Sequence, residues 1–153
     1  MSTKKLHAFL DENQVKYLKI GHSPAYTAQE IAAAVHIPGN ELAKTVMVKL
    51  DDEITMVVLP ADHRINFDKL KSGTGVSEAA LAAESEFGNL FPDCTLGAMP
   101  PFGNLYGIDV LVDSSLAESD KITFNACTHT ELIQLSYSDF ESLVGPKVMD
   151  LSW

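Results

Sequence analysis

The order of apolar and polar residues predicts a helix, a strand and a β-hairpin in the first part of the chain. Apolar residues recur at helical spacing within residues 2–13, which predicts a short amphipathic helix. Residues 15–20 alternate between apolar and polar, which is the period of a half-buried strand. Residues 46–50 and 54–59 are largely apolar, as expected of central strands, and the acidic residues 51–53 between them predict a hairpin turn.

Capping residues mark the expected helix boundaries. Thr27 and Glu30 form a capping box, in which both side chains satisfy free amides at the start of a helix. The alanine-rich helix that follows is expected to end near Pro38, because proline cannot continue it. Three more helices are expected: from a cap at Asn66 to about Lys71, over residues 84–90, and from a second capping box at residues 138–141 to Gly145. Further strands are expected at residues 108–112, 121–124 and 132–135.

The irregular alternation of these helices and strands predicts an α+β fold. We expect a single domain over residues 1–153, with a mixed, mostly antiparallel sheet or partial barrel and surrounding helices. No repeat or low-complexity linker divides the chain, and a hydrophobic content of 46% is enough for one core. The sequence also lacks the glycine fingerprints of dinucleotide-binding and P-loop proteins, which disfavours a doubly wound parallel fold.

The net charge of −10 is concentrated in the second half of the chain. Residues 1–73 hold nine basic and nine acidic residues, whereas residues 74–153 hold two basic and twelve acidic residues. A cationic surface would therefore be built from Lys4, Lys5, Lys16, Lys19, Lys44, Lys49, Arg64, Lys69 and Lys71. Extended binding to a nucleic-acid duplex is disfavoured, because it needs a strongly basic face. The alternative is an acidic, solubilising surface with scattered lysines.

Several absences point to a cytoplasmic protein that works without a metal or a cofactor. The first residues lack the apolar stretch of a secretory signal, and no run reaches the roughly 18 apolar residues of a spanning helix, so no membrane partner is expected. Cys94 and Cys127 show no C-x-x-C spacing, so we expect structural thiols in a reducing compartment rather than a disulfide or a zinc site. The histidines also lack the spacing of metal ligands.

The most distinctive segment is residues 97–103, Gly-Ala-Met-Pro-Pro-Phe-Gly. Its two prolines have fixed φ angles and no N–H group, and its flanking glycines can adopt backbone angles that other residues avoid. We therefore expect a stiff loop in which the amides of Gly97, Ala98 and Met99 are free to bind a ligand. Because no side chain in this segment performs acid–base chemistry, any function must use the backbone.

Three polar side chains are candidates for chemistry, each with a structural alternative. Lys44 stands at the entry to an apolar strand, where its ammonium either meets an anion or reaches solvent. His129 lies in a polar turn, where it can act as a base, touch a substrate or serve only the turn. Cys127 is two positions from His129 and would share a strand face with it, but without an orienting third group a structural role is favoured.

Taken together, four short segments resemble the YbaK / prolyl-tRNA synthetase editing-domain family. These segments are residues 43–45 (Ala-Lys-Thr), 59–62 (Leu-Pro-Ala-Asp), 97–103 and 128–131 (Thr-His-Thr-Glu). Their order and spacing are similar to the family over nearly the whole chain, from His22 to Leu143. The lysine–threonine pair and the Gly-x-x-x-Pro loop are the marks of the family. The residue before the Thr-His pair is usually glycine there, whereas this chain has Cys127.

The resemblance implies a freestanding deacylase that hydrolyses the ester of mischarged tRNA. Ala-, Cys- or Ser-tRNA is the implied substrate, with the tRNA for proline favoured. The catalytic groups would be Lys44 and the backbone amides of Gly97, Ala98 and Met99. The amides would stabilise charge on the carbonyl oxygen while a water attacks, and Lys44 would bind the terminal nucleotide or steady the loop and its developing charge. The substrate-binding residues would be His22, Thr27, Thr45, Pro100, Pro101, Phe102 and His129. The implied partners are the acceptor end of the tRNA and an aminoacyl-tRNA synthetase.

Two other functions remain open at this point. The first is a noncatalytic module of the same fold that binds aminoacylated tRNA ends or nucleotides. The second is a thiol hydrolase that uses Cys127 and His129, in which alkylation of the cysteine would abolish activity.

Overall fold

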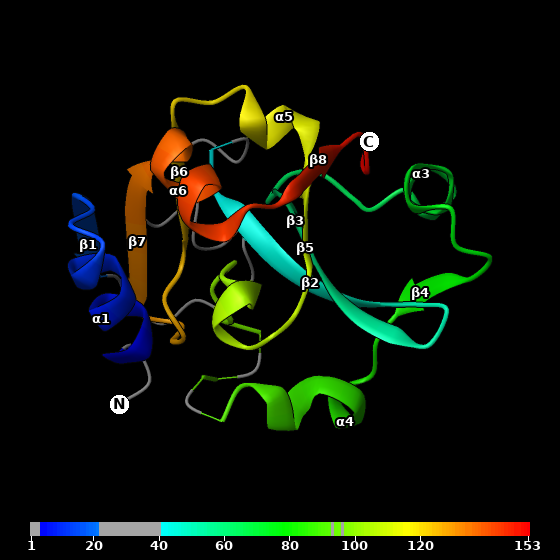
Figure 1. The fold of residues 1–153 in the computed structure, drawn as a ribbon, viewed down its shortest axis with the longest axis horizontal. Coiled ribbons are helices and arrows are strands. Elements are labelled where there is room, and N and C mark those ends of the chain that lie inside the picture. Colours follow the sequence, from blue (N-terminus) through cyan, green and yellow to red (C-terminus); the bar gives the residue numbers. More distant parts are fainter. Residues whose placement is uncertain (1–3, 22–40, 93, 96) are drawn as a thin grey trace.

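Two β-sheets form the centre of the structure, and short helices surround them (Figure 1). The computed structural model describes residues 4–21, 41–92, 94–95 and 97–153. The capping box at Thr27 and its alanine-rich helix lie outside the described residues.

The larger sheet has five strands in the order β4-β2-β3-β5-β8. Its strands are β2 (Ala43–Leu50), β3 (Glu53–Pro60), β4 (Ala79–Leu81), β5 (Val110–Asp113) and β8 (Lys147–Met149). Strands β2 and β3 form the predicted antiparallel hairpin, and its turn residues Asp51 and Asp52 have φ angles of 48° and 83°, the left-handed values of a tight hairpin turn. Strands β3, β5 and β8 pair in parallel, so the sheet is mixed.

The smaller sheet has three antiparallel strands in the order β1-β7-β6. Its strands are β1 (Tyr17–Gly21), β6 (Lys121–Asn125) and β7 (Glu131–Ser136). A bridge between Leu42 and Thr123 joins the start of β2 to β6, so the two sheets are continuous at this corner. The structure therefore confirms the expected α+β fold with mixed sheets and surrounding helices.

The helices are short and lie around the two sheets. They are α1 (Lys4–Glu12), α3 (Phe67–Thr74), α4 (Glu84–Phe87), α5 (Ser114–Ala117) and α6 (Tyr137–Val144), with 3₁₀ turns η1 (Gly88–Leu90) and η2 (Gly103–Leu105). Helix α1 packs at the three-stranded end of the molecule, and α3 lies at the other end (Figure 1). Among the described residues, no helix is long and apolar enough to cross a membrane.

The N-cap residues show which predicted helix starts are right and which are wrong. Asn66 caps α3 as expected, because its side chain accepts hydrogen bonds from the amides of Asp68 and Lys69. The predicted start of the last helix is wrong by two residues: Ser136, not Ser138, is the N-cap of α6 and accepts from the amide of Asp139. The sequence pattern missed β4, α5 and β8, because segments of three or four residues are too short to show a period.

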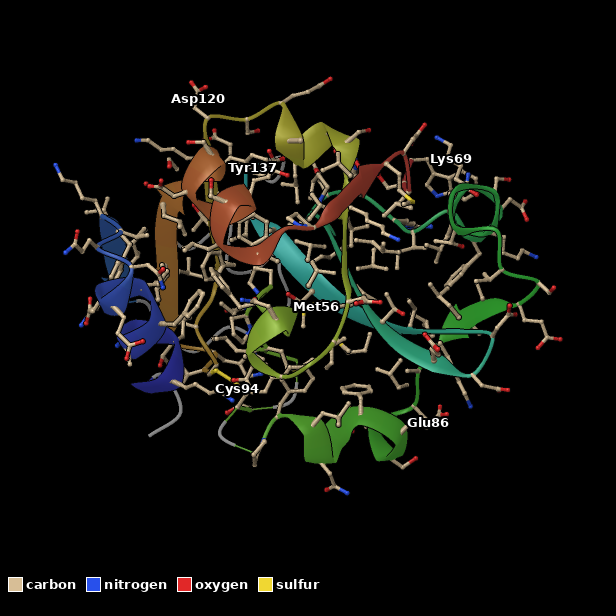
Figure 2. The ribbon with its side chains drawn as sticks, in the orientation of Figure 1. Met56, Lys69, Glu86, Cys94, Asp120 and Tyr137 are labelled. Atoms are coloured by element: carbon tan, nitrogen blue, oxygen red, sulfur yellow. A yellow bond between two sulfur atoms is a disulfide. The ribbon has the colours of Figure 1, made fainter. Side chains whose placement is uncertain are left out.

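The five-stranded sheet separates two hydrophobic clusters, because successive side chains of a strand point to opposite faces. The first cluster lies between the two sheets and contains Ala43, Met47, Met56, Met99, Phe102 and Phe124 among others. The second cluster lies beneath α3 and contains Val48, Val57, Leu59, Leu70 and Leu151. Figure 2 shows Met56 in the middle of the molecule, whereas Lys69 and Glu86 are at its periphery. This two-sided arrangement decides which site residues can meet.

Gly103 provides a test of the packing that holds residues 97–103 against the sheet. A Cβ at this position would lie 2.6 Å from the carbonyl oxygen of Ile108 and 2.7 Å from a methyl carbon of Val110. Because backbone cannot move cheaply, Gly103→Ala is expected to lower the free energy of unfolding by about 1–3 kcal/mol. The matched control Gly21→Ala meets no atom within 4 Å and is expected to stay within about 0.5 kcal/mol of the wild type. Urea denaturation of both variants measures the difference, and equal stabilities would contradict the close packing.

Candidate active site

The loop of residues 97–103 is anchored in the core and exposes only its first residue. Gly97 is exposed and has a φ of +89°, a conformation that favours glycine. Residues 98–103 are buried. The centroid of the Phe102 ring lies 5.4 Å from that of Phe124 and 5.5 Å from that of Phe140. The prolines therefore form a rigid base, and Gly97 is the part of the loop that a ligand can reach.

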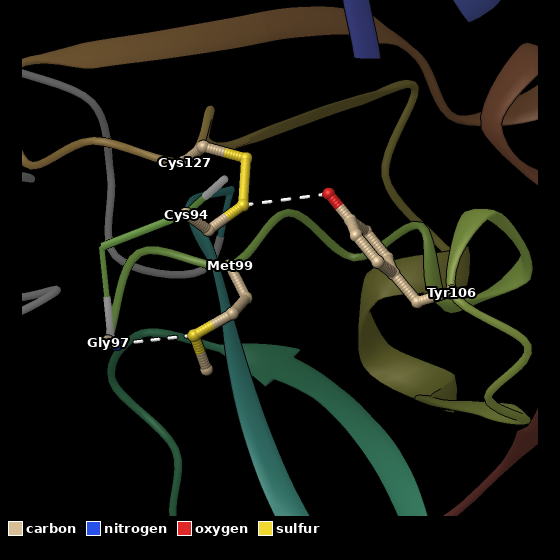
Figure 3. The surroundings of a disulfide bond; sticks show 5 residues. All are labelled: Cys94, Gly97, Met99, Tyr106 and Cys127. Carbon is tan, nitrogen blue, oxygen red and sulfur yellow. Dashed lines mark hydrogen bonds between the residues drawn. A yellow bond between two sulfur atoms is a disulfide. The ribbon is translucent and has the colours of Figure 1, made fainter. Parts of the chain in front are cut away.

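The three amides of this loop are not equivalent. The Ala98 amide donates to the Thr95 carbonyl oxygen at 3.0 Å, which corrects the expectation that this amide is free. The Gly97 amide contacts the Sδ atom of Met99 at 3.2 Å (Figure 3), and a thioether is a weak acceptor. Within the described part of the chain, the Met99 amide donates to no acceptor. Among the described residues, therefore, only the Ala98 amide of these three donates to a carbonyl oxygen.

The turn that follows β6 packs directly against this loop. The Thr95 amide donates to the Cys127 carbonyl oxygen, and the Cys127 amide donates to the Ala98 carbonyl oxygen, both at 2.9 Å. The His129 ring lies over Gly97, since a Cβ built on Gly97 would be 3.5 Å from Cε1 and 3.7 Å from Nε2 of that ring. The structure therefore brings together four of the predicted residues: Gly97, Ala98, Met99 and His129.

A disulfide joins Cys94 to Cys127 beside this loop (Figure 3), so the expectation of two free structural thiols is wrong. The sequence separation of 33 residues hid the pairing, because only the folded turn brings the two α-carbons within 4.3 Å. Cys127 is buried and has a φ of 72°, the left-handed conformation that glycine adopts without a Cβ penalty. The glycine that the family resemblance implies at this position would adopt the same backbone without strain.

Lys44 occupies a different environment from the loop. Its Nζ donates to the carbonyl oxygen of His63 at 2.5 Å and contacts that of Ala61 at 3.4 Å. Partial burial lowers the pKa of Lys44; Asp62 opposes this effect, and Arg64 adds to it. The lysine is thus a partly desolvated cation held by backbone carbonyls at the start of β2.

Strand alternation places Lys44 and its neighbour Thr45 on opposite faces of β2. Ala43, on the same face as Thr45, packs in the cluster that contains Met99, whereas the Lys44 side chain leaves from the other face. The structure therefore divides the predicted residues into a loop group around Gly97 and a lysine group around Lys44. His22 and Thr27 lie outside the described residues.

The sequence did not identify the groups that hold Lys44. The acceptors are backbone carbonyls after β3, and the segment of residues 59–62 in the family resemblance was the only signal that pointed to them. Among the described residues, no group of three or more His, Cys, Asp or Glu side chains could hold a metal ion.

Comparison with protein families identifies the class of this domain. The sequence profile of the aminoacyl-tRNA editing domain matches residues 22–143 of the chain. The chain therefore belongs to the aminoacyl-tRNA editing domain family, which confirms the resemblance to YbaK and to the editing region of prolyl-tRNA synthetase.

Relatives and solved structures agree with this family. The chain is 26% identical over 107 residues to a proline–tRNA ligase of Bacillus cereus and 27% identical to that of Bacillus cytotoxicus. The match spans 70% of this chain but only 19% of each ligase. The fold is shared with a crystal structure of a hypothetical protein (TM-score 0.87, 24% identity, 98% of this chain and 100% of that one). The fold is also shared with a crystal structure of a proposed trans-editing enzyme for prolyl tRNA synthetase. The TM-score is 0.83 at 19% identity, and the match covers 99% of this chain and 97% of that one.

The disulfide and the left-handed turn give a paired stability test. Cys94→Ala removes the crosslink but leaves the Cys127 backbone strained, so it is expected to lower the free energy of unfolding by about 2–4 kcal/mol. The double variant Cys94→Ala/Cys127→Gly loses the same crosslink but relieves the left-handed strain, and is expected to be at least as stable as the single variant. Denaturation without reductant measures both. A wild type whose stability is unchanged by a thiol reductant would contradict the crosslink.

Proposed function

We propose that this protein is a trans-acting deacylase that hydrolyses the ester bond of mischarged aminoacyl-tRNA. The observation that carries the proposal is Gly97, an exposed residue with a left-handed backbone at the start of a buried proline loop. The His129 ring lies beside it, and the chain belongs to the editing-domain family. The proposed trans-editing enzyme with the same fold supports action in trans.

The loop would act by stabilising charge on the substrate. Attack of water on the ester carbonyl builds negative charge on the carbonyl oxygen, and fixed backbone N–H groups stabilise such charge without reorganisation. The Gly97 amide would give up its weak hydrogen bond to the Met99 sulfur and donate to this oxyanion instead, because the oxyanion is a far better acceptor. The Ala98 amide would contribute only by holding the turn to Thr95.

The remaining steps need no protein nucleophile. Water adds to the carbonyl carbon, the bond to the ribose oxygen breaks, and the proton released from the water ends on that oxygen. The ribose hydroxyl next to the ester would relay this proton, accepting it from the water while passing its own proton to the leaving oxygen. His129, adjacent to Gly97, would line the amino-acid pocket or orient the water. The buried loop residues Pro100, Pro101 and Phe102 would support the pocket from behind, and Thr45 would approach it from β2.

Lys44 would bind the terminal nucleotide of the tRNA. Its ammonium is partly desolvated and fixed by two carbonyls, so it is preorganised for an anionic phosphate. Contact would be confined to the acceptor end, because the basic residues lie in the first half of the chain and the second half is strongly acidic. Such a limited contact predicts only a modest dependence on salt.

The substrate proposed is Ala-, Cys- or Ser-tRNA, with the tRNA for proline preferred, since the matched ligases charge that tRNA. A synthetase would be the second partner. A noncatalytic binding module is the main alternative and would bind aminoacylated tRNA without releasing the amino acid. The thiol hydrolase is disfavoured, because Cys127 is buried and carries no free thiol in this structure.

The role of Lys44 is tested by hydrolysis of a panel of tRNAs. Lys44→Ala is expected to lower kcat/KM for mischarged proline tRNA by about 10–100-fold, the value of one charge-assisted hydrogen bond. The control Lys147→Ala removes an exposed lysine from β8 and is expected to leave the rate unchanged. The panel carries alanine, cysteine, serine and proline on the same tRNA. A normal rate for Lys44→Ala would refute the role, and tight binding without release by the wild type would favour the binding module.

The role of Gly97 is tested by adding a side chain at the left-handed position. Gly97→Val is expected to reduce kcat by about 10²–10³-fold, because the side chain displaces both the amide and the His129 ring. Gly75→Val adds the same side chain at another left-handed glycine, the C-cap of α3, and separates loss of stability from loss of catalysis. If Gly97→Val kept the wild-type kcat, the loop would lie outside the active site.

A further inference from the structure

We infer that residues 151–153 form a clamp that positions Lys44, with Ser152 as the positioning residue. This inference rests on the role proposed for Lys44. It assigns a function to a segment at the far end of the sequence from that lysine, and to a hydroxyl group that the deacylation mechanism does not use.

The clamp pairs with the segment that follows the Lys44 acceptors. Ile65 and Ser152 form an antiparallel bridge. On one side of it, Arg64 and Trp153 exchange two backbone hydrogen bonds of 3.2 and 3.1 Å, and on the other the Asn66 amide donates to the Leu151 carbonyl oxygen at 2.8 Å. The backbone of residues 64–66 is therefore fixed immediately after the turn at residues 61–63.

A buried carboxylate anchors the clamp to the sheet. Asp113, at the end of β5, is 2% exposed, and its Oδ1 accepts from the Leu151 amide at 2.8 Å. Its Oδ2 accepts from the amide and the hydroxyl of Ser115. Burial opposes ionisation of Asp113, but these hydrogen bonds, together with one from Ser152, outweigh it and lower the pKa of the carboxyl. The anchor is thus a charged and fully bonded group.

Ser152 connects the anchored segment to the residue that holds Lys44. The Ser152 hydroxyl and Nδ1 of His63 share a hydrogen bond of 2.8 Å. The carbonyl oxygen of the same His63 accepts from Lys44 Nζ. The chain of contacts therefore runs from Asp113 to the Leu151 amide, along the backbone to Ser152, and through His63 to Lys44.

This arrangement is not a nucleophilic triad. In a triad the histidine accepts the proton of the serine, and the acid contacts the opposite ring nitrogen. Here Ser152 and Asp113 both face Nδ1 of His63, at 2.8 and 4.0 Å. The acid at the opposite nitrogen is Asp62, whose Oδ1 lies 3.8 Å from Nε2, too far for the hydrogen bond of a triad. Ser152 is also 5% exposed, which keeps substrate away from it. Positioning is the role that the geometry allows.

Ser152→Ala and Ser115→Ala form a matched pair of variants. Ser115→Ala removes a hydroxyl that donates to the Asp113 carboxylate, whereas Ser152→Ala removes the hydroxyl that contacts His63. We expect Ser152→Ala to loosen the His63 carbonyl, to let water reach the Lys44 ammonium, and so to raise the pKa of Lys44 toward its ordinary value. We also expect kcat/KM for mischarged tRNA to fall about tenfold, as for one lost hydrogen bond. Ser115→Ala is expected to change neither quantity.

The readouts are the pKa of Lys44 by NMR of ¹⁵N-labelled lysine side chains and the deacylation rate of the full chain. The clamp is overturned if Ser152→Ala leaves the pKa of Lys44 unchanged, or if Ser115→Ala shifts it equally. If the wild type deacylates none of the tRNAs, the proposed function fails, but the Lys44 pKa still tests the clamp. If the pKa shifts and the rate does not, Lys44 is positioned as inferred and the catalytic role of the lysine is refuted.

Discussion

The left-handed backbone at Gly97 is the constraint on which the candidate site depends. A φ of +89° turns the chain so that one amide stays at the surface while the next six residues enter the core. Two prolines and the buried Phe102 then hold that turn in place. Backbone donors fixed in this way need no reorganisation when charge develops, which is the property a hydrolase without a reactive side chain requires.

The second feature of the site is its division by strand β2. One face of β2 supports the loop group through Ala43 and Met47, and the other face carries Lys44 toward the turn after β3. A substrate that used both groups would reach around the end of this strand, with its ester at Gly97 and a phosphate at Lys44. This geometry fits a small, single-stranded tRNA end better than an extended duplex, in agreement with the charge distribution.

The sequence predicted the long elements and the loop, but not the contacts between distant segments. Periodicity located the β2–β3 hairpin, and a capping residue located the start of α3. The disulfide of Cys94 and the clamp at Ser152 escaped prediction, because each joins segments that only the folded chain brings together. The free amide expected at Ala98 was also wrong, since nothing local in the sequence specifies the hydrogen bond to Thr95.

The central claim is that the Gly97 amide receives the substrate carbonyl. Amide NMR of the ¹⁵N-labelled protein, titrated with a non-hydrolysable 3′-aminoacylamino-adenosine, tests this claim directly. The Gly97 amide resonance is expected to shift strongly as its hydrogen bond moves from sulfur to oxygen, while the resonance of the Ala98 amide, bonded to Thr95, stays nearly fixed. Saturable binding that leaves the Gly97 resonance in place would contradict the claim.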